Sequence, residues 1–201
     1  TVVDDVILSN KDYMDIILNQ DLYYHNSYHM GMVDENDMLT FYRGKLKIMA
    51  PDGSIVGSFE GNEYQDYVAE HTVPWSYLKF PYLKQIGWKG FVDGVDSGIY
   101  RATPLSRLNA ADGMATPQAQ AEFERFYDTL GGKPVQPTLA THWARLVELL
   151  YATENWVRLA TDPEIVGETF RTLPTETPTE GVGCVEAPRG TLTHHYWTDE
   201  R

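Results

Sequence analysis

Cysteine is almost absent from this chain, which has a single one among its 201 residues. A lone cysteine excludes a disulfide bond within the chain and is compatible with a reducing compartment. We therefore expect a cytoplasmic protein.

Basic residues are also scarce. Lysine and arginine number 16 against 29 aspartates and glutamates, which gives a formal net charge of -13. A nucleic-acid partner needs a basic surface for its phosphates, and an anionic membrane attracts one as well. The composition therefore excludes nucleic acid as a partner and disfavours a membrane surface.

Long apolar runs are missing too. No stretch approaches the roughly 20 apolar residues that cross a bilayer, so we expect no membrane span. The chain begins at Thr1 without an initiator methionine or a basic leader. This start argues against a signal peptide and is typical of an excised internal fragment.

The chain does have enough apolar residues for a core. Hydrophobic residues make up 42% of it, and five are tryptophans. Its first half has both helical and strand patterns. Ser9 or Asn10 can cap an amphipathic helix, residues 23–32 predict a packed loop, alternation within residues 39–59 predicts a hairpin, and residues 62–71 predict a short helix.

The second half is more helical. A helix is expected from Thr116 to about residue 130, and a longer one from Thr138 or Thr141 to Ala160. A loop over residues 173–180 then leads to a strand that ends in a polar turn with no return strand. The apolar stripe of the longer helix is expected at Leu146, Leu150, Thr153, Val157 and Ala160.

These patterns predict an α+β fold with a small antiparallel sheet, two or three longer helices and a terminal strand. We expect residues 1–201 to form a single segment. Its parts are an α+β part with the hairpin at about 1–110, a helical part at 111–173, and a loop and strand at 174–201.

The most unusual stretch is residues 181–196, which combines charge, proline, glycine and paired histidines. Pro188 lacks a backbone donor, and Gly190 permits a close backbone approach. Glu186 and Arg189 lie three residues apart and can pair if both are partly buried. We interpret this stretch as a preformed wall of a site.

Three blocks of sequence carry a resemblance. They are residues 186–192 (EAPRGTL) followed by HHY at 194–196, residues 74–82 (PWSYLKFPY), and residues 98–109 (GIYRATPLSRLN). In this order they resemble motifs of the large, catalytic subunit of cytoplasmic multi-subunit nickel–iron hydrogenases of the bidirectional and viologen-reducing type. The long helices would then belong to the helical bundle of that large subunit.

The resemblance implies that the parent protein cleaves dihydrogen heterolytically at a Ni-Fe centre. Electrons would pass to an iron-sulfur small subunit and to downstream electron-transfer subunits. Four cysteines hold the metals in that family, one CxxC pair near each end, and both pairs are absent here. Thiolates are the ligands that such a centre needs. The resemblance therefore implies an internal segment that binds no metal or cofactor and is inactive alone.

The same resemblance implies candidate site residues near the hydrogen-activating centre, none of them a metal ligand or a direct participant in the chemistry. They are Glu186 and Arg189 in the late motif, and Arg101 and Arg107, which flank Pro104 in the middle motif. The alternative role of Glu186 and Arg189 is a structural ion pair that anchors the turn at Pro188.

Two other functions compete with this one. A metal-free relative, similar to the quinone-module subunit of respiratory complex I, would be an interaction and proton-coupling protein. A metal-assisted hydrolase would use His25, His29, His194 and His195. The adjacent pair at 194–195 points to opposite faces of a strand and cannot chelate one ion together. Cys184 is expected to be an inert buried thiol.

Overall fold

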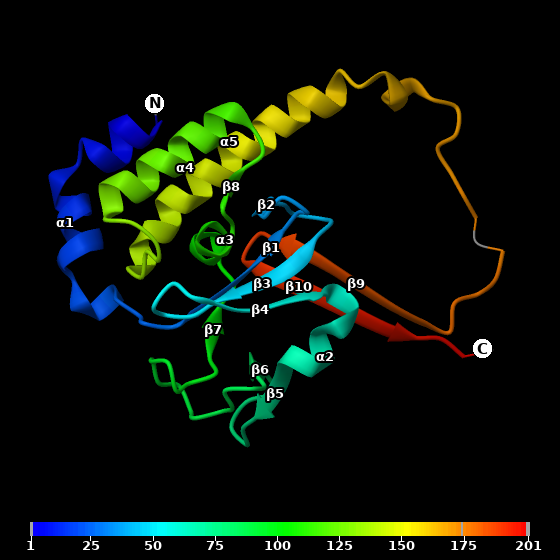
Figure 1. Ribbon diagram of the computed structural model, residues 1–201, viewed down its shortest axis with the longest axis horizontal. Coiled ribbons are helices and arrows are strands. Elements are labelled where there is room, and N and C mark those ends of the chain that lie inside the picture. The colour runs from blue at the N-terminus through cyan, green and yellow to red at the C-terminus, as the bar shows by residue number, and fades with distance from the viewer. Residues whose placement is uncertain (1, 174, 200–201) are drawn as a thin grey trace.

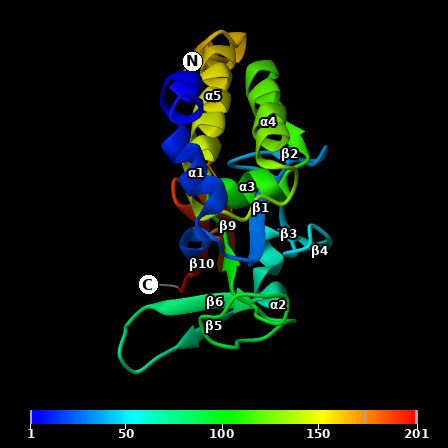
Figure 2. The same cartoon turned by 90° about the vertical axis from the view of Figure 1, so that its left-hand side faces the viewer.

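The computed structural model describes residues 2–173 and 175–199 and arranges them in layers around a small central sheet. Figures 1 and 2 show the longer helices on one side of this sheet and a separate pair of strands with a short helix on the other. The strand order is β4-β3-β1-β2-β8, and β7 also pairs with β1. The strands are β1 (Tyr28–Val33), β2 (Met38–Leu39), β3 (Lys45–Met49), β4 (Ile55–Glu60), β7 (Tyr100–Arg101) and β8 (Gly113–Met114).

Strand β1 is the centre of the molecule, and all six of its residues are buried. It pairs antiparallel with β3 and β2 and parallel with β7. Because both faces are covered, the strand lacks the alternation of a half-exposed strand. For this reason the expectation of a loop over residues 23–32 was wrong for residues 28–32, whereas residues 24–27 lie outside the helices and strands, as expected of a loop.

The two faces of β1 contribute to two hydrophobic cores. Met30 and Met32 lie in the core shared with β3, β4 and β6, whereas Val33 lies in the core beneath the helices. Gly31 faces helix α3 (Pro104–Ala110) so closely that a Cβ there would lie 2.6 Å from the Cα of Arg107. The helix therefore packs directly on the strand backbone.

The predicted hairpin is confirmed. Strands β3 and β4 pair antiparallel, with Lys45 opposite Glu60 and Met49 opposite Ile55. The turn between them includes Gly53 at φ +90°, a left-handed conformation that favours glycine.

Both long helices are confirmed as well. Helix α4 (Pro117–Leu130) begins with proline at its first position and ends at Gly131, which is left-handed. Helix α5 (Thr141–Ala160) follows the short 3-10 turn Thr138–Ala140. Trp143 of α5 is fully buried against Phe126 of α4, with their ring centroids 5.4 Å apart.

The expected apolar stripe of α5 was correct only in its first half: Leu146 and Leu150 pack, partly buried, against the core, but Thr153, Val157 and Ala160 are exposed. Val157 and Leu159 are exposed, because the last two turns of the helix extend beyond α4 (Figure 1). The buried face is one position away from the expected stripe and includes a carboxylate. Its members are Trp143, Ala144, Val147, Glu148 and Tyr151.

The N-terminal helix is confirmed in a shorter form. Helix α1 (Lys11–Asn19) is capped by Asn10, whose side chain accepts the Tyr13 N–H at 3.1 Å. A π-helical turn, Val3–Leu8, precedes α1, and the short 3-10 turn Asp21–Tyr23 follows it.

The region that follows β4 contains a short helix and then a strand. The 3-10 turn Gly61–Glu63 and helix α2 (Tyr64–Tyr67) lead into β5 (Val68–Thr72), which pairs antiparallel with β6 (Lys79–Leu83). The helix expected over 62–71 therefore ends at Tyr67.

A long hairpin ends the described chain. Strands β9 (Glu180–Ala187) and β10 (Gly190–Trp197) pair antiparallel across residues 188–189, and the 3-10 turn Pro163–Val166 lies in the connection from α5. The terminal strand was correct, but its partner β9 precedes it, so the missing return strand was a wrong inference. Part of the expected polar end, residues 200–201, lies outside the described residues.

An α+β fold with small sheets and several helices is therefore confirmed. The assignment of the helices to the bundle of a hydrogenase large subunit has no support from the structure. Within the described residues, no helix combines the length and the apolar character required to cross a bilayer.

Candidate functional site

The candidate site is centred on Arg107, which α3 carries into the interior of the molecule. All seven residues of this helix are buried, and Arg107 itself is 1% exposed. A buried guanidinium is costly unless it is paired and hydrogen-bonded. In the structure Arg107 has carboxylates as ion-pair partners and a backbone carbonyl as a further hydrogen-bond acceptor.

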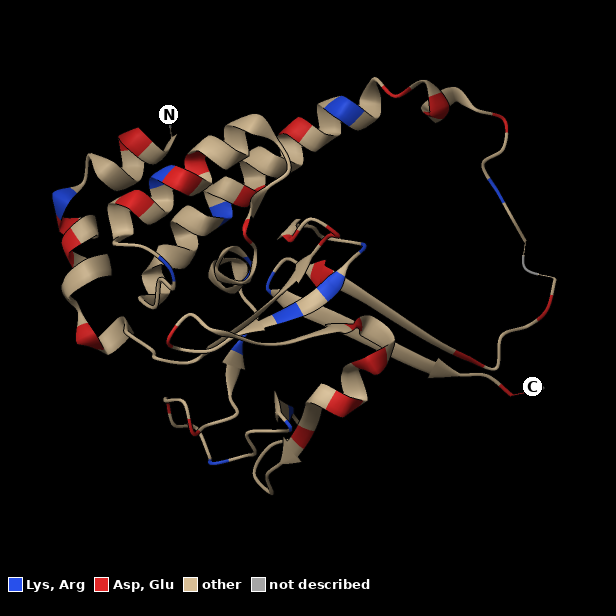
Figure 3. Cartoon of the chain, in the orientation of Figure 1, with Lys and Arg blue, Asp and Glu red and all other residues tan. Residues whose placement is uncertain are grey.

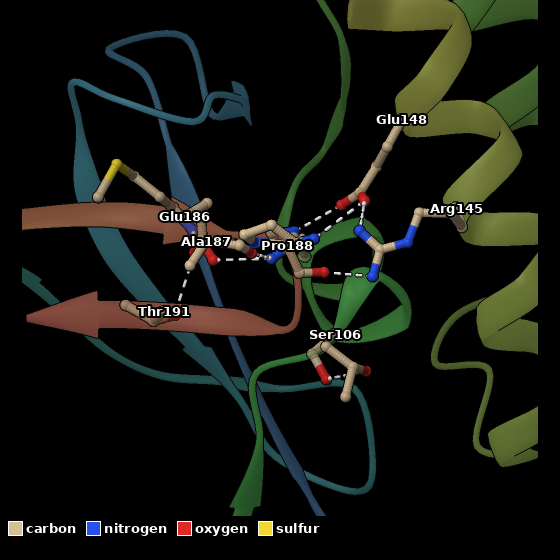
Figure 4. Close-up of polar contacts among 10 residues, drawn as sticks. Ser106, Arg145, Glu148, Glu186, Ala187, Pro188 and Thr191 are labelled. Carbon is tan, nitrogen blue, oxygen red and sulfur yellow. Dashed lines mark hydrogen bonds and ion pairs between the residues drawn. The ribbon is translucent and has the colours of Figure 1, made fainter.

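Two carboxylates from distant parts of the chain bind Arg107. Glu148 of α5 accepts from its Nε at 2.5 Å and from its Nη2 at 2.9 Å, in a bidentate pair. Glu186 of β9 accepts from Nη1 at 3.1 Å, and the carbonyl of Ala187 accepts from the same nitrogen at 2.9 Å (Figure 4). We call Arg107, Glu148 and Glu186 the Arg107 cluster.

The Glu186 carboxylate also binds two further donors. The Met32 backbone N–H donates to Oε1 at 2.8 Å, and the Thr191 hydroxyl donates to the same atom at 3.1 Å. Burial raises the pKa of Glu186 above its ordinary value, and this effect outweighs the opposite influence of Arg107. The cluster thus joins α3, α5, β1 and the hairpin at one point.

Glu186 and Arg189 do not form the pair that the sequence suggested. The ion-pair partner of Glu186 is Arg107, 79 residues earlier, whereas Arg189 is exposed at the tip of the hairpin. The turn at Pro188 is anchored by another arginine, because Arg145 of α5 donates to the Pro188 carbonyl.

Arg101 lies apart from this cluster, in a second polar network beside β1. It donates to Ser27 Oγ at 2.9 Å, to the His25 carbonyl at 2.7 Å and to the Gln136 carbonyl at 2.9 Å. Burial lowers the pKa of Arg101 to about 10. Its contacts tie β7 to the segment before β1 and to the segment before α5.

His29 occupies the centre of this second network and is completely buried. Its Nδ1 lies 3.2 Å from Ser106 Oγ, and its Nε2 lies 3.1 Å from Gln136 Oε1. Burial, assisted by the charge of Arg101, lowers the pKa of His29 to about 3. The imidazole is therefore neutral at pH 7, and both ring nitrogens already have partners.

The remaining histidines lie elsewhere and do not converge. His25 pairs with Asp93 at 3.0 Å, and His195 binds Glu180 at 2.8 Å. His194 is exposed on the opposite face of β10 from His195, as expected. Across residues 2–173 and 175–199 no three histidine, cysteine, aspartate or glutamate side chains are placed to hold a metal ion. The geometry does not support a metal-assisted hydrolase.

Cys184 is the free thiol of β9, and its Sγ lies 3.4 Å from Thr193 Oγ1. Burial raises the pKa of this thiol above its ordinary value. A raised pKa lowers the fraction of reactive thiolate at neutral pH. The environment is therefore that of a packed residue.

An open groove of about 300 Å³ runs beside the Arg107 cluster. Phe41 and Arg145 both line it. The Arg107 guanidinium carbon is 5.9 Å from the ring centroid of Phe41, and Arg145 approaches Glu148 at 3.4 Å. The arrangement holds the charged side chains of α3, α5 and β9 in fixed positions relative to one another.

Glu148 is the member of the cluster that sequence reasoning missed. A signal was present, because Glu148 shares one helical face with Ala144, Val147 and Tyr151. A carboxylate within an apolar stripe needs a buried partner. The sequence alone gave no indication of which basic residue that partner is.

No family model matches the chain, but the known proteins that it resembles are named as hydrogenase subunits. It is 45% identical over 199 residues to an iron-sulfur subunit of the F420-non-reducing hydrogenase of Archaeoglobus profundus, covering 99% of this chain and 40% of that protein. It is 40% identical over 174 residues to the beta subunit of the NAD-reducing hydrogenase HoxS of Cupriavidus necator, covering 86% of this chain and 34% of that protein.

A solved structure is similar as well. A crystal structure of an NAD+-reducing NiFe hydrogenase in the H2-reduced state matches with a TM-score of 0.84 and 30% sequence identity. The match covers 99% of this chain and 42% of that chain. The chain thus spans between about one third and two fifths of the length of these proteins.

These names correct three expectations. The first relative is named an iron-sulfur subunit, which contradicts our assignment to the large catalytic subunit with its Ni-Fe centre. The partner roles that followed from that assignment are corrected with it. The relatives are hydrogenase subunits, which also contradicts the alternative of a complex I relative.

An iron-sulfur cluster does not fit the residues of this chain. Such clusters are held by cysteine thiolates, commonly four of them. The chain has one cysteine, and that thiol packs against Thr193 in the β9–β10 hairpin. What the comparisons support is similarity, over nearly the whole chain, to part of a hydrogenase subunit.

Proposed function

We propose that residues 1–201 are one metal-free segment of a larger hydrogenase subunit, and that the protein acts as an oxidoreductase within a hydrogenase complex. The segment contributes structure to that complex. It fixes the β9–β10 hairpin against α3 and α5, so that other subunits of the complex bind a rigid surface.

The observation that carries this proposal is the Arg107 cluster. Its three charged side chains come from α3, α5 and β9, and each is almost completely shielded from solvent. A buried ionic group of this kind contributes little net stability compared with apolar packing, but it can specify how elements are positioned. Charge held in this way suits a positioning role.

The proposal places other hydrogenase subunits as partners, because the relatives carry subunit names of multi-subunit hydrogenases. Any iron-sulfur cluster of the complex is then held by polypeptide other than these residues. We propose Glu186 and Arg107 as positioning residues, with Arg101 holding a separate network. Arg189, exposed at the tip of the hairpin, is a candidate contact for the neighbouring polypeptide.

The test is assembly of the complex from the full-length subunit that carries this segment. The Arg107→Leu variant leaves the buried Glu186 without an ion-pair partner and Glu148 with Arg145 alone. We expect it to lose co-purification with the other subunits and hydrogen-dependent dye reduction together. Arg158→Leu is the matched control, because Arg158 lies on the exposed end of α5 and contacts Asn155 of the same helix. Normal assembly of Arg107→Leu would refute the proposal.

A further inference from the structure

Strands β10 and β5 each belong to a two-stranded sheet, so one edge of each has no neighbouring strand among the described residues. Strand β10 pairs with β9 alone, and β5 pairs with β6 alone. An unpaired edge presents backbone N–H and C=O groups to any strand that can reach it. The register of each hairpin determines which residues present these groups.

On β10 the presenting residues are Thr191 and Thr193. The two-residue turn 188–189 places Ala187 opposite Gly190, and such a turn is flanked by a pair that exchanges backbone hydrogen bonds. Bonded and non-bonded pairs alternate along an antiparallel ladder. Thr191 and Thr193 therefore lie in non-bonded pairs, with their backbone groups directed away from β9.

The structure confirms this alternation from the other strand. Glu186 is the cross-strand partner of Thr191, and its N–H donates outward, to the Phe41 carbonyl at 2.8 Å. Because Thr191 belongs to the same non-bonded pair as Glu186, its N–H also points away from the partner strand, toward the outer edge of β10.

On β5, Glu70 presents its N–H and C=O and Val68 presents its C=O, because the Val68 N–H donates to the Tyr64 carbonyl at the end of α2. The Lys84 N–H donates to the Tyr67 carbonyl at 2.8 Å, which makes these two a bonded pair in the register of β5 and β6. Bonded and non-bonded pairs alternate along the two strands, so Val68 and Glu70 lie in non-bonded pairs. Their backbone groups are therefore directed away from β6.

Strand β6 agrees with this register. The Leu83 N–H, opposite Val68, donates outward to the Gly98 carbonyl at 2.7 Å. Pro81 lies opposite Glu70 and has no backbone N–H. Proline is tolerated at this position because a residue of a non-bonded pair donates no hydrogen bond to the neighbouring strand.

Both edges border one groove of about 580 Å³. Residues 68–70 of β5 and 191–193 of β10 line it, with Met30, Leu46 and Tyr100 among the other lining residues. Consecutive residues of a strand point alternately to opposite faces, so three in a row line a groove only where the strand presents its edge. The groove therefore reaches the edge of each strand, and Pro81 of β6 lines it as well.

We propose that this groove binds an extended segment of another subunit of the hydrogenase complex, which adds a strand to the free edge of β10, with β5 as the opposite wall of the groove. The inference rests on the proposed function for the identity of the partner. Strand addition of this kind takes its affinity from main-chain hydrogen bonds and its specificity from alternate side chains.

Charge and polarity define the segment that fits. Glu70 is the charged residue among those lining the groove, and its carboxylate binds Lys79 in an exposed pair at 2.9 Å. Exposed pairs contribute little energy, so an incoming cation can replace Lys79. Figure 3 shows further acidic residues on the neighbouring 3-10 turn Gly61–Glu63 and helix α2, one on each. The segment therefore alternates apolar residues, facing Met30 and Leu46, with basic ones.

The first experiment measures binding of a probe to this chain by fluorescence anisotropy. The probe is a fluorescein-labelled, end-blocked hexapeptide of alternating valine and lysine. Thr193→Pro removes one outward N–H and keeps the pairing with β9, since proline is tolerated at such edge positions. We expect Thr193→Pro to weaken binding about fivefold, the effect of one net hydrogen bond, and the control Thr193→Ser to leave it unchanged.

The second experiment keeps the proposal testable if Thr193→Pro fails to fold. Amide exchange of the unmodified chain by NMR should be fast at Thr191 and Thr193 and slow at Leu192, and the probe should slow the two threonines. Equal binding by a folded Thr193→Pro variant, or no slowing by the probe, would overturn the proposal. Slowing that appears with chain concentration alone would identify a second copy as the occupant and overturn it too.

The same exchange, measured by mass spectrometry on the full-length subunit, separates this inference from the proposed function. Protection of residues 190–197 on assembly supports the groove. Assembly without that protection overturns the groove and leaves the proposed function standing. Probe binding without assembly contradicts the proposed function and the identity of the partner together.

Discussion

Replacing Arg107 with leucine tests the physical basis of the cluster. The leucine is similar in width to the aliphatic part of arginine, and it removes every donor that Glu148 and Glu186 share. The side chains of these glutamates are 5% and 0% exposed, so water cannot replace the lost partner. Glu186 would then lack a counter-charge, and Glu148 would keep only its 3.4 Å contact with Arg145.

The expected cost follows from this geometry. Removing one partner of a buried ion pair typically costs about 3–5 kcal/mol. Glu186 keeps the Met32 N–H and the Thr191 hydroxyl, and Glu148 keeps Arg145, so the two losses overlap and do not add in full. We expect the free energy of unfolding to fall by about 3–5 kcal/mol in total.

Urea unfolding, followed by tryptophan fluorescence at pH 7, measures this loss. Arg189→Leu is the matched control, because it makes the same chemical change at the exposed arginine of the motif and should alter stability by less than about 0.5 kcal/mol. A loss below about 1 kcal/mol for Arg107→Leu, or equal losses for both variants, would refute the reasoning.

Three further changes have equally definite outcomes. Trp143→Ala empties a fully buried site and should cost about 3–5 kcal/mol in urea unfolding; a cost below about 1 kcal/mol would contradict the packing of α5 on α4. Gly31→Ala places a methyl group 2.6 Å from the Arg107 Cα and should cost about 1–3 kcal/mol, whereas the control Gly181→Ala meets open space and should be neutral. His29 has a pKa of about 3 when folded against about 6.5 unfolded, so the unfolded chain binds the extra proton between these values. Stability should therefore fall as the pH drops from about 6.5 toward 3, and His29→Gln should flatten this part of the stability–pH curve; an unchanged slope would disprove it.

Local patterns in the sequence were sufficient for elements whose signals lie within one stretch of chain. Helix α4 has proline at its start and a left-handed glycine at its end, and the β3–β4 hairpin has alternation on both sides of a glycine turn. These signals act between neighbouring residues, so a single sequence displays them.

Elements buried on every side were missed. Strand β1 is covered on both faces, and all seven residues of α3 are buried, so neither shows the periodicity of a half-exposed element. The terminal hairpin was only half recognised for a different reason. Its first strand contains Gly181 and Gly183, which weaken a strand pattern.

The ion-pair partner of Glu186 could not be predicted from the sequence, because the two residues are distant along the chain. Proximity along the chain suggested Arg189, but the bound arginine lies 79 residues away and reaches Glu186 only through the packing of α3 on β1. The candidate residues did include Arg107. Its relation to Glu148 and Glu186 depends on tertiary structure.

The central claim is that the segment works without a metal of its own. Metal analysis of the purified 201-residue chain, by plasma mass spectrometry after expression in iron- and nickel-supplemented medium, tests it most directly. We predict only traces of iron and nickel, far below one atom per chain. Stoichiometric iron or nickel that remains bound through gel filtration would contradict the claim.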